Sequence, residues 1–168
     1  MDVIYSPDKH TYVFHVDVKS DAKLVSWIHN FGSEAGNCHH IQPRNIAWAG
    51  LSTGEMMLAL MHEAYERSDK WEYFVLIGHE SLPLTSLAYT EQFLSSHPKG
   101  SNFVHCMRVD GYDFFGQWEN VINRMEEIVV DDLQGVLIEQ INKRRKLWSD
   151  VTFYKGIQLV VLSRDFVR

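Results

Sequence analysis

Three side chains that could bind a ligand or carry protons follow one apolar segment: His15, Asp17 and Lys19. The segment YVFHVDVKS, residues 12–20, begins with residue types that favour a pleated, buried strand. In open α/β sheets, ligands bind beyond the carboxyl ends of the strands, which is where these groups would lie. A carboxylate there can accept hydrogen bonds from a ligand, and an ammonium can neutralise an anion. Taken alone, Asp17 could instead cap the turn after the strand.

A second candidate lies in the segment NIAWAG, residues 45–50. Trp48 stands in a glycine-flanked turn before a helix, where its ring could lie against a base or a sugar or could pack in the core. Together with Asp17 it makes a candidate nucleotide pocket.

Two other clusters have simpler interpretations. Cys38, His39 and His40, with His29 nearby, suggest zinc, but adjacent histidines on a glycine-flanked loop lack the spacing of a structural zinc site. We therefore expect an ordinary surface loop there and no metal. The basic run at residues 143–146 could touch phosphate or could be the charged end of a helix. The sequence contains no GxGxxG, Walker, GxSxG or HExxH motif.

The elements that would position these groups alternate between strands and helices. We expect helices near residues 24–31, 51–67, 85–95, 116–129 and 132–147, and strands near residues 11–17, 71–77, 102–105 and 158–162. Ser52 and Glu55 have the spacing of a capping box at a helix start, and the apolar run 71–77 indicates a strand covered on both faces. This order predicts an α/β sandwich with a mostly parallel sheet flanked by helices.

Composition limits the class of protein. The 168 residues, 45% hydrophobic and 23% charged, suit one globular domain, and the net charge of −6 argues against a nucleic-acid partner. The two cysteines do not fix the redox compartment. The first residues lack the pattern of a signal peptide, and no segment approaches the ~20 consecutive apolar residues of a membrane span.

Five motifs, in order along the chain, resemble the inverting glycosyltransferase family that contains the branching N-acetylglucosaminyltransferases and the peptide O-xylosyltransferases. They are HVDVKS at 15–20, NIAWAGLS at 45–52, WEYFVLIGHESLPL at 71–84, GSNFV at 100–104 and YKGIQLVVLSRDFV at 154–167. The resemblance implies a GT-A-like, Rossmann-related fold that binds a UDP-sugar. We expect residues 1–168 to form a single, partial catalytic domain that is truncated at both ends.

The resemblance also implies the residues of the donor site. Asp17 would bind the uracil or the ribose, the turn at 46–48 would line the uridine pocket, and the residues after the late glycine would face the sugar or the acceptor. The expected nucleotide-sugar contacts are Val16, Asp17, Ile46, Ala47, Trp48, Gln158 and Leu159.

An inverting transferase needs a carboxylate general base for the acceptor hydroxyl and a cationic group for the leaving diphosphate. No D-x-D triplet is present, since Lys19 stands at the third place after Asp17. The resemblance implies a metal-independent enzyme without a cofactor, and a general base that lies beyond Arg168. The function expected is transfer of xylose or N-acetylglucosamine from a UDP-sugar to a protein or glycan hydroxyl, on the lumenal side of the Golgi membrane, with an anchor that this chain does not contain.

Two alternatives remain open. The turn that in the resembled family carries an Asp has Ser81 here, and Gln158 and Leu159 replace other residues of the family pattern. These departures favour a degenerate, non-catalytic nucleotide-sugar-binding or scaffold domain. The other alternative is an unrelated α/β binding domain.

Overall fold

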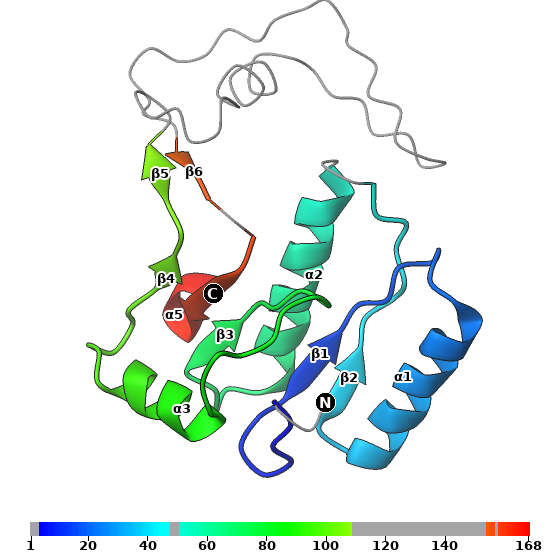
Figure 1. Ribbon diagram of the computed structural model, residues 1–168, viewed down its shortest axis with the longest axis horizontal. Coiled ribbons are helices and arrows are strands. Elements are labelled where there is room, and N and C mark those ends of the chain that lie inside the picture. The colour runs from blue at the N-terminus through cyan, green and yellow to red at the C-terminus, as the bar shows by residue number, and fades with distance from the viewer. Residues whose placement is uncertain (1–3, 48–50, 109–153, 157) are drawn as a thin grey trace, which may run out of the picture.

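The computed structural model describes residues 4–47, 51–108, 154–156 and 158–168 (Figure 1). In chain order its elements are β1 (Tyr12–Phe14), α1 (Ala22–Ala35), β2 (Cys38–His40), α2 (Leu51–Arg67), β3 (Tyr73–Val75), α3 (Leu87–Ser95), β4 (Phe103–Val104), β5 (Met107–Arg108), β6 (Tyr154–Lys155), β7 (Val160–Ser163) and α5 (Arg164–Val167). The helices expected at 116–129 and 132–147, and the basic run at 143–146, lie outside the described residues.

The first layer is a parallel pair of strands with a helix beside it. β1 and β2 run in the same direction, with Tyr12 opposite Cys38 and Phe14 opposite His40. Parallel strands need a crossover connection, and α1 provides it while packing against β2. The expectation of an ordinary surface loop at residues 38–40 is therefore wrong, because backbone pairing with β1 makes this polar segment a strand.

Helix α1 is longer than the expected 24–31. The Asp21 carboxylate caps its start by accepting from the Lys23 N–H at 2.8 Å, and Gly36, with φ of 64°, ends it in the left-handed conformation. Gly32 lies inside the helix, where a Cβ atom would come within 2.3 Å of the His40 ring. The missing side chain allows α1 to approach β2 closely.

Helices α2 and α3 confirm the predictions for 51–67 and 85–95. Leu60 on α2 is buried, as its apolar periodicity predicts. The capping box is wrong, because Ser52 has a helical backbone within the first turn and its hydroxyl accepts a hydrogen bond from the Ala47 N–H at 2.9 Å. A hydroxyl cap does occur on α3, where Ser86 accepts from the Tyr89 N–H.

The second sheet has the order β3-β7-β4, and β7 is antiparallel to both neighbours. The α/β class is confirmed, but the sheet is only partly parallel. Strands β3 and β4 point the same way around the α3 crossover, and the late strand β7 fills the space between them in the opposite direction. Val75 and Ile77 are 48% and 49% exposed, so the expectation that residues 71–77 are covered on both faces is wrong.

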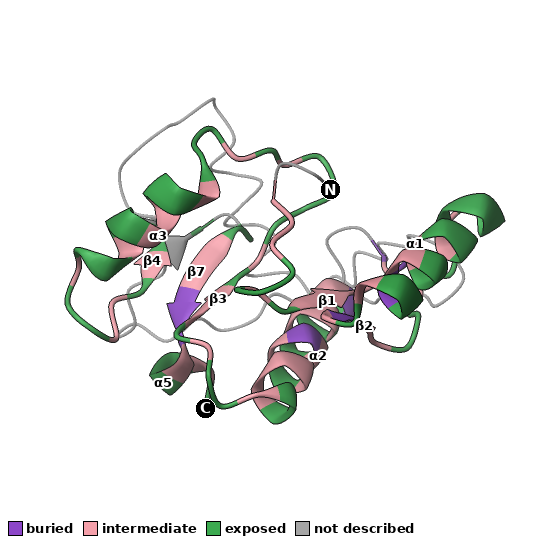
Figure 2. Cartoon of the chain, turned by 90° about the horizontal axis from the view of Figure 1, so that it is seen from below, coloured by how far each residue is buried: buried purple, intermediate pink, exposed green. Residues whose placement is uncertain are grey.

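Helix α2 lies between the β1–β2 layer with α1 on one side and the group of α3, β4 and α5 on the other (Figure 1). The buried residues gather on β7, on the inner face of α2 and at the β1–β2 layer, while the outer turns of α1 and α3 are exposed (Figure 2). The candidate site lies beyond the carboxyl ends of β1 and β2.

Candidate functional site

The chain segments that follow β1 and β2 stay side by side after the strands end. The Ile41 N–H donates to Phe14 O at 3.0 Å, and further along the Val18 N–H donates to Arg44 O at 3.2 Å. Asp17 and Arg44 form a parallel bridge. The sequence-predicted residues Val16, Asp17, Ile46 and Ala47 are thereby brought to one edge of the parallel layer.

The Asp17 carboxylate links these two segments. Its Oδ1 accepts from the Lys19 N–H at 2.8 Å, which caps the local turn, and its Oδ2 accepts from the Ile46 N–H at 3.2 Å. Asp17 therefore acts both as a turn cap and as a link to a segment 29 residues away. The side chain is 26% exposed and reaches solvent.

The pKa of Asp17 lies below its ordinary value. Burial acts to raise this pKa, but the hydrogen bonds from Lys19 and Ile46 and the Lys19 charge together outweigh it. The group is ionised at neutral pH. An ionised carboxylate offers about four acceptor positions. Among the described residues, the Lys19 N–H, the Ile46 N–H and the Lys19 ammonium use three of them, and these contacts leave one position for a ligand donor.

The Lys19 ammonium lies between the same two segments. It is 3.3 Å from Asp17 Oδ2 and 2.9 Å from Asn45 Oδ1, and it also donates to Ile46 O. The contacts around residue 46 thus involve one cation, one carboxylate and two carbonyl groups. No signal in the local sequence pairs Lys19 with Asn45, because the contact depends on the two strands lying side by side.

Residues 45–47, which we call the 45–47 turn, are also fixed to helix α2. The Ala47 N–H donates to Ser52 Oγ at 2.9 Å, and the Thr53 hydroxyl donates to Ala47 O at 3.3 Å. Ala47 is 8% exposed and Val16 is 9% exposed, so their side chains belong to the core.

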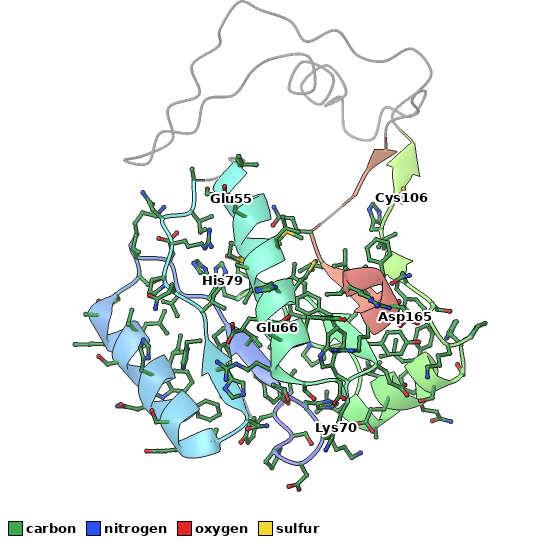
Figure 3. All side chains as sticks on the ribbon, turned by 180° about the vertical axis from the view of Figure 1, so that it is seen from behind. Glu55, Glu66, Lys70, His79, Cys106 and Asp165 are labelled. Carbon is green, nitrogen blue, oxygen red and sulfur yellow. The ribbon has the colours of Figure 1, made fainter. Side chains whose placement is uncertain are left out.

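His15 supports the turn from the other side. Its Nε2 accepts from the Arg44 N–H at 3.1 Å, which requires the unprotonated ring nitrogen. The pKa of His15 is lowered, mainly by burial and also by the Arg44 charge, while Asp17 opposes the shift. Arg44 Nη1 lies 4.0 Å from the exposed carboxylate of Glu55, which Figure 3 shows near the start of α2.

Residues 1–168 match the family model of the Core-2/I-branching enzymes. The chain belongs to this family. A search of the curated proteins found no match. The family is one of glycosyltransferases, so the resemblance seen in the sequence is confirmed and an unrelated α/β binding domain is excluded. Membership implies a nucleotide-sugar donor and an acceptor, and it does not favour the non-catalytic alternative.

Three predicted nucleotide-sugar contacts of this glycosyltransferase remain, namely Trp48, Gln158 and Leu159. Gln158 and Leu159 are exposed and precede β7, in the antiparallel sheet, and no hydrogen bond joins either of them to Asp17. Trp48 lies outside the described residues. The structure therefore brings together four of the seven expected contacts, and all four come from the first two motifs.

The histidine and cysteine cluster adopts a packed arrangement. Cys38 is buried, and the His40 ring lies against His29, with 4.6 Å between ring centroids, and against Gly32. The planes of the His29 and His40 rings are tilted by 37° to each other. In the described part of the chain, no group of three or more His, Cys, Asp or Glu side chains is arranged to hold a metal. Within the same residues, no helix is long and apolar enough to cross a membrane.

Proposed function

We propose that this glycosyltransferase binds a UDP-sugar at the carboxyl edge of β1 and β2. The single observation that carries the proposal is the Asp17 carboxylate, which joins two chain segments through the Lys19 and Ile46 N–H groups and has one acceptor position that no contact among the described residues uses. A uracil N–H or a ribose hydroxyl is a suitable donor for that position. Val16, Ile46, Ala47 and Trp48 would complete the nucleoside contacts.

The reaction that we propose is inverting transfer of xylose or N-acetylglucosamine to a hydroxyl of a protein or a glycan. Gln158 and Leu159 would face the sugar or the acceptor. We propose further that the donor binds without a metal, since Lys19 occupies the place of a second carboxylate after Asp17 and its ammonium lies 3.3 Å from Asp17 Oδ2. Residues 1–168 would act as one domain, and the proposed location is the Golgi lumen.

A second candidate is a nucleotide-sugar-binding protein without transfer activity. It rests on Ser81, which stands in the turn after β3 where the family resemblance implies an acidic residue. The Ser81 N–H closes that turn on Gly78 O at 3.0 Å, and the neighbouring His79 and Glu80 side chains are 93% and 88% exposed. Both candidates require UDP binding. Sugar transfer, followed by mass spectrometry of a serine peptide or a glycan acceptor, separates them.

The test of the donor site compares two aspartates whose carboxylates each accept a hydrogen bond from the backbone N–H two residues later. Asp17 accepts from the Lys19 N–H and Asp21 accepts from the Lys23 N–H, each at 2.8 Å. We expect Asp17→Asn to weaken UDP binding by about tenfold or more, because a hydrogen bond to a charged group is worth about 1.5–3 kcal/mol. Asp21→Asn is expected to lower stability and to leave the affinity for UDP unchanged.

The measurement is the thermal shift of each variant across a UDP titration, because a ligand that binds only the folded state stabilises it. UDP-xylose, UDP-N-acetylglucosamine and UDP-glucuronic acid are titrated in parallel to identify the sugar. The proposal is refuted if millimolar UDP gives no shift in the unmodified protein, or if Asp17→Asn binds UDP as tightly as the unmodified protein does.

A further inference from the structure

The Lys19 ammonium is surrounded by oxygen atoms from two chain segments. Asp17 Oδ2 lies 3.3 Å away and Asn45 Oδ1 lies 2.9 Å away, and the third partner is the backbone oxygen of Ile46. An ammonium has three N–H donors, so each has one oxygen partner. The Lys19 side chain is nevertheless 57% exposed, and burial does not force it into this position.

The oxygen types around Lys19 are those that bind hard cations in proteins. Carboxylate, side-chain amide and backbone carbonyl oxygens together form the ligand sets of calcium, magnesium and manganese. Here the cation is covalently attached to the chain. It stands two residues after Asp17, and its reach to Asn45 and Ile46 connects the end of the β1 segment to the 45–47 turn.

Removing the charge would leave these oxygens facing one another. The 45–47 turn would keep the bonds from the Ile46 N–H to Asp17 and from the Ala47 N–H to Ser52. It would lose the attraction between the Lys19 ammonium and the oxygens of Asn45, Ile46 and Asp17. The turn would then be held to the carboxylate less tightly, through the Ile46 N–H bond.

We propose that Lys19 is a positioning residue that substitutes for a bound cation and holds the 45–47 turn in the conformation that receives the nucleoside. The inference rests on the proposed UDP-sugar site and adds to it the means by which that site is kept in place. Lys19 acts through Asp17, Asn45 and Ile46, and it needs no contact with the donor.

The first experiment measures the turn without any ligand. In the full chain, Lys19→Met keeps the length and the apolar stem of the side chain but removes the charge. We expect faster hydrogen exchange at the Ile46 amide, which donates to Asp17, and no change at the Leu162 amide in the distant β7. The control is Lys23→Met on α1, which removes an exposed lysine of the same length and should leave the Ile46 amide unchanged.

The second experiment replaces the ammonium with a metal. Lys19→Asp provides a second carboxylate beside the same oxygens, so Mn²⁺ should slow exchange at the Ile46 amide in this variant and have no effect in the unmodified protein. UDP binding follows the same pattern. We expect it to weaken by up to about fivefold in Lys19→Met, in keeping with the modest strength of exposed ion pairs, and to become Mn²⁺-dependent in Lys19→Asp.

The outcomes separate this inference from the proposed function. Unchanged exchange at the Ile46 amide in Lys19→Met would refute the positioning role, whether or not UDP binds. A Lys19→Asp variant whose Ile46 exchange ignores Mn²⁺ would refute the substitution for a cation. If the exchange results hold but UDP fails to bind the unmodified protein, the proposed donor site is wrong and the Lys19 contact has only a structural role.

Discussion

Replacing Arg164 with alanine should loosen the attachment of α5 to the carboxyl end of α2. The Arg164 guanidinium lies between two aromatic rings, 4.2 Å from the centroid of Tyr65 and 4.7 Å from that of Trp71. Its Nη1 donates to Ser68 O at 2.6 Å, just beyond the last turn of α2. A cation at a helix carboxyl end also interacts favourably with the unpaired carbonyl groups there.

These contacts give the expected size of the effect. A hydrogen bond from a charged donor contributes about 1.5–3 kcal/mol, and each cation–π contact contributes about 0.5–1 kcal/mol. Since Arg164 is only half-buried, we take the lower part of the sum, about 3 kcal/mol. For a chain of this size, that loss corresponds to a decrease in Tm of about 6–12 °C.

Thermal unfolding followed by circular dichroism measures this change, and Arg67→Ala provides the control. Arg67 pairs with Glu63 one helical turn away, with 2.6 Å between Nη2 and Oε1, but both side chains are solvent-accessible at 42% and 29%. Such a pair contributes about 0.3–0.5 kcal/mol, so Tm should fall by less than about 2 °C. If Arg164→Ala lowers Tm no more than Arg67→Ala does, the packing of Arg164 between the rings does not stabilise the fold.

Two further predictions concern the β1–β2 layer. The pKa of His15 is lower in the folded chain, so its contribution to stability is complete above the ordinary pKa of 6.5 and is lost as the pH falls toward the folded pKa, because the unfolded chain takes up the proton first. The variant His15→Gln can still accept from the Arg44 N–H, and its Tm should decrease less between pH 7 and pH 5 than that of the unmodified protein. An identical decrease would contradict the role given to His15. Gly32→Ala should lower the free energy of unfolding by about 1–3 kcal/mol in a denaturant titration, because the added methyl group meets the His40 ring. Adding His40→Ala should remove most of this overpacking. If the losses in the double variant are additive, the clash is not the cause.

The local sequence was sufficient for α2, the longest of the described helices. The spacing of apolar residues in α2 predicted bounds that match Leu51–Arg67, since an amphipathic helix of this length carries its own periodic signal. The same reasoning located α3 and the region of β3 and β4. It failed at β2, because Cys38-His39-His40 is short and polar and becomes a strand only by pairing with β1.

Sheet direction also depended on distant parts of the chain. Alternating strands and helices suggested a mostly parallel sheet, and that pattern applies to the β1–α1–β2 unit. β7 instead enters between β3 and β4 from the far end of the described chain, with Leu162 opposite Phe74 and Val161 opposite Phe103. Nothing in the apolar run around Val161 specifies its direction, because the side-chain pattern of a strand is the same read either way.

The sequence by itself determined the family, the α/β class, and an ionised carboxylate at the end of the first strand. Only the tertiary structure decided what that carboxylate holds. The Ile46 N–H and the Asn45 oxygen reach Asp17 and Lys19 because β1 and β2 pair in parallel and their following segments stay adjacent. Hydrogen bonds between residues far apart in the chain have no local signature, since their geometry exists only after the strands have found each other.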